Sequence, residues 1–134
     1  MNLIVCLDLK NGMRFNNRRQ SRDAAVIDRI CAITSGSELF VDEYSQKLFT
    51  LLCSDLNIHS NPSEIPNKGD YCFIEQCKHV PDERNIEKII VYRWDKIYPH
   101  DEVFTIDLKK WKLAFKQEFK GNSHDKITEE VYVK

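Results

Sequence analysis

The chain contains 134 residues, of which 42% are hydrophobic and 31% are charged. This length supplies the core of one domain, and this composition is typical of a folded globular protein rather than a disordered one. Its apolar runs are far shorter than the roughly 20 residues of a membrane-spanning helix, so we expect no association with a membrane. The net charge of −1 disfavours a general polyanion binder. We expect residues 1–134 to form a single domain.

The first half of the chain alternates strand patterns with helix patterns. Leu3 to Leu7 is a β-branched, apolar run that predicts a buried strand ending at the Asn11-Gly12 turn signal. Met13 to Gln20 has no period and predicts a loop. Ser21 is expected to cap a helix that runs to about Thr34 and packs its apolar stripe on a sheet. Further predicted elements are strands at 38–41, 56–59 and 71–74, and a second helix capped by Asp42 with Tyr44, Leu48, Leu51 and Leu52 on one face.

The second half of the chain predicts strands and a terminal hairpin. Lys88 to Arg93 indicates a buried strand. Trp111 to Phe119 alternates apolar with polar residues, which predicts a strand with one dry face and with Lys112 and Lys116 on the wet face of a sheet edge. After a turn, Ile127 to Val133 returns as the antiparallel partner. Together these patterns indicate an α/β fold with a mainly parallel sheet and a C-terminal antiparallel hairpin.

The cysteines indicate buried thiols rather than a metal site. The chain has five cysteines, an odd number, and most of them stand in apolar segments. This usage predicts free thiols and a cytoplasmic location. Cys72, Cys77 and His79 have no matching second pair of ligands, so we predict no metal.

The best candidate site lies where the 13–20 segment enters the first helix. Arg18, Arg19, Gln20, Ser21 and Asp23 stand beyond the end of a strand, on the side where α/β folds bind ligands. Arginine forks suit a carboxylate or a phosphate. Asp23, if partly buried, would hold a ligand amidine or donate a proton with a raised pKa, and it is the candidate catalytic residue. The alternative is that Ser21 and Asp23 cap the helix and the arginines are solvated.

Two other groups are weaker candidates. Tyr92 and Arg93, at the end of a strand, would stack on a ring or clamp an anion, or else lie at the rim of the core with Arg93 paired to an acid. The neighbours Ser123, His124 and Asp125 do not indicate a catalytic triad, because the members of a triad are brought together by the fold. In a hairpin turn they are expected to act as turn formers.

Three stretches resemble the dihydrofolate reductase fold, a three-layer α/β sandwich. They are Leu3 to Met13, Ser21 to Ile27, and the closing segment from Ile106 to Val133. The resemblance implies that Asp23, with apolar Ile27 four residues later, grips a pterin ring. The same resemblance places phosphate-binding groups at the start of the second helix, where this chain has Asp42 and Glu43. Two carboxylates there would repel a phosphate.

Other departures also concern the cofactor. The family's Pro-Trp pair is replaced by Asn17 to Ser21, and its Gly-Gly turn has no counterpart, since no two glycines are adjacent. We therefore predict that the scaffold is kept, that the NADPH site is lost and that the chain uses no cofactor.

The chain also resembles a group of short bacterial proteins that are often labelled ribonuclease Z. The shared segments are Asn11 to Ser21, Tyr92 to Trp94 and Ser123 to Thr128. That nuclease chemistry needs clustered metal ligands, whereas the four histidines of this chain are isolated from one another. The residues do not support the label.

The resulting hypothesis is a reductase-fold protein that binds a small anionic or heteroaromatic ligand, of pterin-like or nucleotide-like chemistry, without NADPH. Whether it is an enzyme stays open. The predicted ligand-binding residues are Arg18, Arg19, Gln20, Ser21, Asp23, Ile27, Tyr92 and Arg93. One alternative is a non-catalytic interaction module whose arginine loop docks an acidic protein or RNA. A second alternative is a residual NADPH-dependent reductase.

Overall fold

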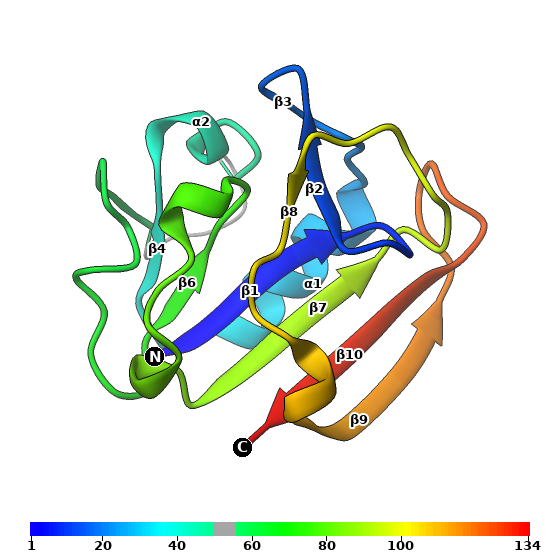
Figure 1. Cartoon of the computed structure of the whole chain (residues 1–134). Coiled ribbons are helices and arrows are strands. Elements are labelled where there is room, and N and C mark those ends of the chain that lie inside the picture. Colours follow the sequence, from blue (N-terminus) through cyan, green and yellow to red (C-terminus); the bar gives the residue numbers. More distant parts are fainter. Residues whose placement is uncertain (50–55) are drawn as a thin grey trace.

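The computed structural model describes residues 1–49 and 56–134 (Figure 1). The strands are β1 (Asn2–Leu7), β2 (Gly12–Phe15), β3 (Arg18–Arg19), β4 (Leu39–Val41), β5 (Leu56–Ile58), β6 (Tyr71–Phe73), β7 (Lys88–Arg93), β8 (Glu102–Val103), β9 (Lys112–Phe119) and β10 (Ile127–Val133). The α-helices are α1 (Ala24–Thr34) and α2 (Glu43–Gln46), and the 3₁₀ turns are η1 (Cys77–His79), η2 (Glu83–Asn85) and η3 (Leu108–Lys110). Within the described residues, seven strands form the main sheet in the order β5-β4-β6-β1-β7-β10-β9, and β3-β2-β8 form a small second sheet.

The main sheet is parallel except at its C-terminal strands. β1 lies between β6 and β7 and is parallel to both, and β4 is parallel to β5 and β6. β10 is antiparallel to both β7 and β9. The prediction of a mainly parallel α/β sheet that ends in an antiparallel hairpin is therefore confirmed.

Side chains alternate between two cores on the two faces of the sheet, because successive strand residues point to opposite faces. On one face, Ile4 and Tyr92 belong to the core that includes Ile27 of α1. On the other face, Val5 and Val91 belong to the core that the 104–111 segment completes. Figure 1 shows α1 behind β1 and β7, with η3 in front of the sheet. The three layers are thus a helix, the sheet, and an outer layer that contains η3 and β8.

The 13–20 segment differs from the predicted loop. It forms most of a hairpin in which β2 pairs with β3, and β2 also pairs with β8. Asn16 and Asn17 turn the chain with φ angles of 50° and 60°, a conformation that asparagine tolerates better than most residues. The sequence of these strands has no apolar–polar alternation. They are stabilised instead by pairing with the distant β8, which local sequence does not reveal.

β9 does not have the dry face that its alternation predicts. Leu113 and Phe115 expose 46% and 45% of their surface. β9 is the edge of the sheet, and in Figure 1 α1 crosses behind β1 and β7 rather than behind this edge. The predicted edge position of Lys112 and Lys116 is confirmed.

Two further predictions are corrected in part. The second helix begins after Asp42 as expected but α2 ends at Gln46, and the predicted Leu51 and Leu52 lie outside the described residues. Cys6, Cys72 and Cys77 are free thiols, whereas Cys31 is disulfide-bonded, so the prediction of free thiols is wrong for Cys31. Across the described ranges, no helix is long and apolar enough to span a membrane.

Candidate functional site

The N-terminus of α1 is capped by Asp23, not by Ser21 as expected. Asp23 has an extended backbone, with φ −152° and ψ 128°, and its carboxylate accepts a hydrogen bond from the backbone N–H of Ala25 at 2.8 Å. The side chain sits at the carboxyl end of the parallel strands and the residue is only 3% exposed. The capping function that was considered for both residues therefore belongs to Asp23.

The same carboxylate holds the turn between β9 and β10. Its Oδ1 accepts from the N–H of Asn122, and its Oδ2 from the N–H of Ser123, each at 2.8 Å. A Cβ on Gly121 would lie 2.5 Å from Oδ2 of Asp23 and 2.9 Å from the carbonyl oxygen of His124. Only glycine lets the turn approach the carboxylate this closely.

His124 completes the cluster. Its Nδ1 lies 2.8 Å from Oδ2 of Asp23, and its Nε2 lies 2.9 Å from Oγ of Ser21. The Tyr98 hydroxyl lies 3.3 Å from the same Nε2. The imidazole also stacks on Trp94, with ring centroids 4.9 Å apart and an interplanar angle of 24°. Asp23, His124 and Ser21, hereafter the Asp23 cluster, are thus linked in a line across two distant segments.

The charge of Asp23 fixes the roles in this line. Burial raises the pKa of Asp23. Hydrogen bonds from Asn122, His124, Ser123 and Ala25 together lower it by more than burial raises it, so the pKa lies well below its usual value. The expected raised pKa is therefore wrong. Because an ionised carboxylate can only accept, Nδ1 of His124 donates to Asp23, and the tautomer with this proton accepts at Nε2 from Ser21.

Ser21, Asp23 and Ile27 meet around a small cavity that Cys6 and Trp94 also line. Its volume is about 10 Å³, which is room for one water molecule. The lone pairs of Asp23 are occupied by the protein's own donors. In this conformation a pterin ring fits neither the cavity nor the carboxylate.

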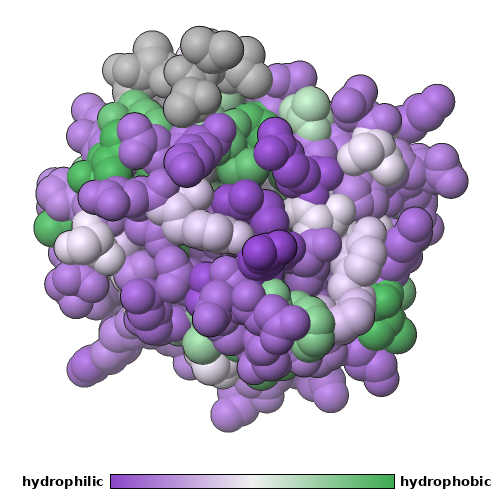
Figure 2. All heavy atoms as spheres, turned by 90° about the horizontal axis from the view of Figure 1, so that it is seen from above, coloured by the Kyte–Doolittle hydropathy of each residue, from purple (hydrophilic) through white to green (hydrophobic). Residues whose placement is uncertain are grey.

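Arg18 and Gln20 lie apart from that cavity, in an open groove. Its volume is about 480 Å³, and we call it the Arg18 groove; it is lined by Phe15, Asn16, Arg18, Arg19, Gln20, Tyr98 and Pro99. The end of the molecule that carries the β2–β3 hairpin is mainly hydrophilic (Figure 2). The structure thus places Arg18, Arg19 and Gln20 at a groove and Ser21, Asp23 and Ile27 at a cavity.

Arg19 is largely engaged by the protein itself. Its guanidinium forms two hydrogen bonds to Glu75, at 2.8 and 3.0 Å. It also stacks over the Tyr44 ring at 4.4 Å from the centroid. Burial lowers the pKa of Arg19, but Glu75 raises it more. Arg19 thus lines the groove with its charge already neutralised.

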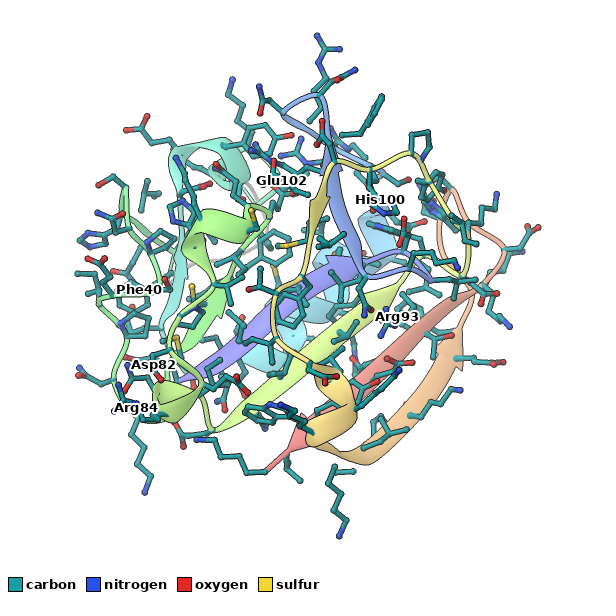
Figure 3. The ribbon with its side chains drawn as sticks, viewed as in Figure 1. Phe40, Asp82, Arg84, Arg93, His100 and Glu102 are labelled. Carbon is teal, nitrogen blue, oxygen red and sulfur yellow. The ribbon has the colours of Figure 1, made fainter. Side chains whose placement is uncertain are left out.

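Tyr92 and Arg93 line neither the cavity nor the groove. Tyr92 is fully buried and donates to Glu129 at 2.7 Å, and Arg29 holds the same carboxylate with two hydrogen bonds. Arg93 pairs with Glu130 at 3.0 Å and donates to the carbonyl of Asp8. Arg93 and His100 are both labelled in Figure 3, where Arg93 lies below His100. Both contact Asp8, since His100 Nδ1 lies 3.4 Å from Oδ2 of Asp8. The alternative of a rim arginine paired to an acid fits Arg93.

Sequence reasoning did not connect His124 or Trp94 with Asp23. It weighed His124 only with its neighbours in the turn. The available signal was the Ser21-x-Asp23 pair at the start of the helix, which supplies a hydroxyl and a carboxylate for a distant base. Only the closing of the hairpin onto α1 shows which base that is.

The start of α2 does not fit a dinucleotide phosphate. Asp42 is buried and accepts from the N–H of Ser45 and from Gln76, and it pairs with His79 at 3.2 Å. A buried carboxylate and a four-residue helix offer no anion site. Over residues 1–49 and 56–134, no group of three or more His, Cys, Asp or Glu side chains is placed to hold a metal ion.

Comparison with known proteins identifies the fold. No protein-family model and no curated protein matches the chain. Among solved structures, the chain is similar to dihydrofolate reductase from Enterococcus faecalis complexed with NADP(H) and RAB-propyl. The TM-score is 0.68 at 11% sequence identity, over 98% of this chain and 94% of that chain. The chain has a dihydrofolate reductase-like fold. An identity this low establishes the fold alone.

Proposed function

We propose that the chain binds a small anionic ligand with an aromatic ring, of nucleotide-like or pterin-like chemistry, in the Arg18 groove and without a nicotinamide cofactor. The observation that carries this proposal is the polar lining of the groove. The Arg18 side chain is exposed and forms no ion pair within the described part of the chain. An exposed guanidinium on this hairpin suits a phosphate or carboxylate.

Gln20 supplies a second recognition group. Its Nε2 donates to Oδ2 of Asp8 at 2.9 Å and to the carbonyl of Pro99 at 3.3 Å. Both partners are acceptors, so the amide cannot flip without placing oxygen against oxygen. Its Oε1 is buried and has no donor among the described residues. Its desolvation costs about 1–3 kcal/mol, and a ligand N–H satisfies this acceptor once the Gln20 side chain turns toward the groove.

Aromatic surface and size complete the argument. Phe15 is 42% exposed, and Tyr98 also lines the groove. Exposed rings beside a cation suit a flat heteroaromatic group. The volume of about 480 Å³ lies within the range of roughly 300–1,000 Å³ that is usual for small-molecule sites.

Calorimetric titration with guanosine monophosphate, folate and inorganic phosphate tests this proposal. We expect at least one of the two aromatic ligands to bind, and Arg18→Ala to weaken its binding at least about tenfold. Arg22→Ala is the matched control, since Arg22 is exposed but lies outside the groove. Binding of neither aromatic ligand, or an equal loss in both variants, would reject the proposal.

Two further arms of that experiment address the alternatives. Thermal stabilisation by NADPH would show that the predicted loss of the cofactor site is wrong. Binding of a single-stranded RNA that exceeds mononucleotide binding and weakens steeply with salt would favour the interaction module.

A further inference from the structure

We infer that Ser21 is a nucleophile activated by His124 and Asp23, and that the chain hydrolyses carboxylic esters. This activity goes beyond ligand binding in the Arg18 groove. Oγ of Ser21 lies 2.9 Å from Nε2 of His124, and Nδ1 of His124 lies 2.8 Å from Oδ2 of Asp23. A hydroxyl, an imidazole and a carboxylate linked in this order are the arrangement by which a serine is activated for attack.

The imidazole is fixed before any substrate arrives. Asp23 is anchored by the N–H groups of Asn122 and Ser123, and the His124 ring stacks on Trp94. His124 and Asp23 are 9% and 3% exposed, whereas Ser21 is partly exposed. The base and its orienting carboxylate are thus buried and held in place by several contacts, and Ser21 is the partly exposed member of the cluster, as a preorganised nucleophile requires.

Helix capping does not account for Ser21. The cap of α1 is Asp23, and the hydrogen bond that the Ser21 hydroxyl makes within the described residues is to His124. The Ser21 hydroxyl is instead held by an imidazole whose other nitrogen faces a carboxylate, which is the geometry that activates a serine.

The reaction balances without a redox partner. Oγ of Ser21 bonds to the ester carbonyl carbon while Nε2 of His124 takes the hydroxyl proton. The bond to the leaving alcohol breaks, and His124 returns the proton to the alcohol oxygen. Water then attacks the acyl group, gives its proton to His124, and releases the carboxylic acid as Ser21 recovers its proton. Asp23 stays ionised and stabilises the imidazolium.

The substrate class follows from what borders the nucleophile. Tyr98 lines the Arg18 groove and its hydroxyl lies 3.3 Å from Nε2 of His124, so one molecule that occupies the groove can extend to the Asp23 cluster. An ester with an anionic aromatic portion fits both. This assignment of substrate charge rests on the proposed function, whereas the assignment of Ser21 as nucleophile does not.

A fluorophosphonate probe tests the nucleophile without using the groove, because the probe has no anionic ring. We expect the wild-type chain to form one adduct, which peptide mass spectrometry locates at Ser21. Ser21→Ala should abolish this adduct, and Ser37→Ala, which removes a hydroxyl far from the Asp23 cluster, should keep it. His124→Gln should slow the labelling by at least about 100-fold.

Circular dichroism checks that each variant folds. If His124→Gln does not fold, the loss of the adduct in Ser21→Ala is the deciding measurement. Absence of an adduct at Ser21 in the wild-type chain, or equal labelling of Ser21→Ala, overturns the inference. Ligand binding without labelling would overturn only this inference, and labelling without ligand binding would overturn only the proposed function. Turnover of p-nitrophenyl acetate by the wild type, lost in Ser21→Ala, is the expected catalytic counterpart.

Discussion

Asp23 accepts a hydrogen bond from Nδ1 of His124 at 2.8 Å, although 101 residues separate them in the chain. This contact joins the start of α1 to the turn of the C-terminal hairpin. The same carboxylate also accepts from Ala25, Asn122 and Ser123. One buried charge therefore holds together the cap of the helix, the turn and the candidate base.

The first prediction concerns the charge of this carboxylate. Asp23→Asn replaces an acceptor oxygen with a donor that would face the donors of Ser123 and His124. Because buried groups then lose their partners, we expect the free energy of unfolding to fall by about 3 kcal/mol. Urea denaturation measures this change. Asp28→Asn, an exposed position on the same helix, should change it by less than about 0.5 kcal/mol.

The second prediction concerns acid. The pKa of Asp23 is lowered from 3.8 in the folded chain, so the folded state binds fewer protons than the unfolded state as this group titrates. Its contribution to stability is complete above the unfolded value and is lost as the pH falls below about 4. Urea denaturation between pH 7 and pH 3 should show this loss, and its slope should be shallower in Asp23→Asn. An equal slope in both proteins would contradict the pKa shift.

The third prediction concerns Gly121. An added Cβ would lie 2.5 Å from Oδ2 of Asp23, so Gly121→Ala must push the turn away from the helix cap. We expect a loss of about 1–3 kcal/mol in unfolding free energy and, by nuclear magnetic resonance, a shift of the His124 ring signals. Gly36→Ala provides the comparison, because Gly36 has a φ of 82° and open space around its Cα. That variant should cost about 1 kcal/mol and leave the His124 signals unchanged.

The fourth prediction concerns the buried Glu129. Burial raises the pKa of Glu129, but hydrogen bonds from Arg29 and Tyr92 lower it by more, so the pKa lies below its usual value. Arg29→Met removes two of those hydrogen bonds. The Glu129 carboxylate, which is only 3% exposed, then has no cation beside it. We expect a loss of about 2–3 kcal/mol at pH 7. The loss should shrink below about pH 5, where Glu129 can take up a proton instead, and a loss that grows with acid would contradict this account.

The fifth prediction concerns the edge strand. Phe115 is 45% exposed on β9, so Phe115→Lys should change the unfolding free energy by less than about 0.5 kcal/mol. Trp111→Ala, at a position only 8% exposed and part of the core in front of the sheet, should cost about 3–5 kcal/mol. Chemical denaturation of the two variants distinguishes an exposed edge from the dry face that the alternation of β9 predicts.

The sheet was readable from sequence because its signals are local. The runs Leu3 to Leu7 and Lys88 to Arg93 predict buried strands, and the structure has β1 and β7 there as adjacent central strands. Hydrophobic periodicity records which faces of a segment avoid water. It does not record how far a neighbouring layer extends. For that reason β9, with a strong alternation, leaves Leu113 and Phe115 exposed.

Local patterns in the sequence were enough to predict the α/β class and the closing hairpin, since each follows from residues that are close together in the chain. Tertiary structure alone decided that Tyr92 turns inward to Glu129, that Arg19 is neutralised by Glu75, and that His124 faces Asp23. These are contacts between distant segments, and the direction of the Asp23 pKa depends on how many donors such segments bring to one carboxylate. The sequence sets which hydrogen-bond donors are available, and tertiary packing sets which of them contact the carboxylate.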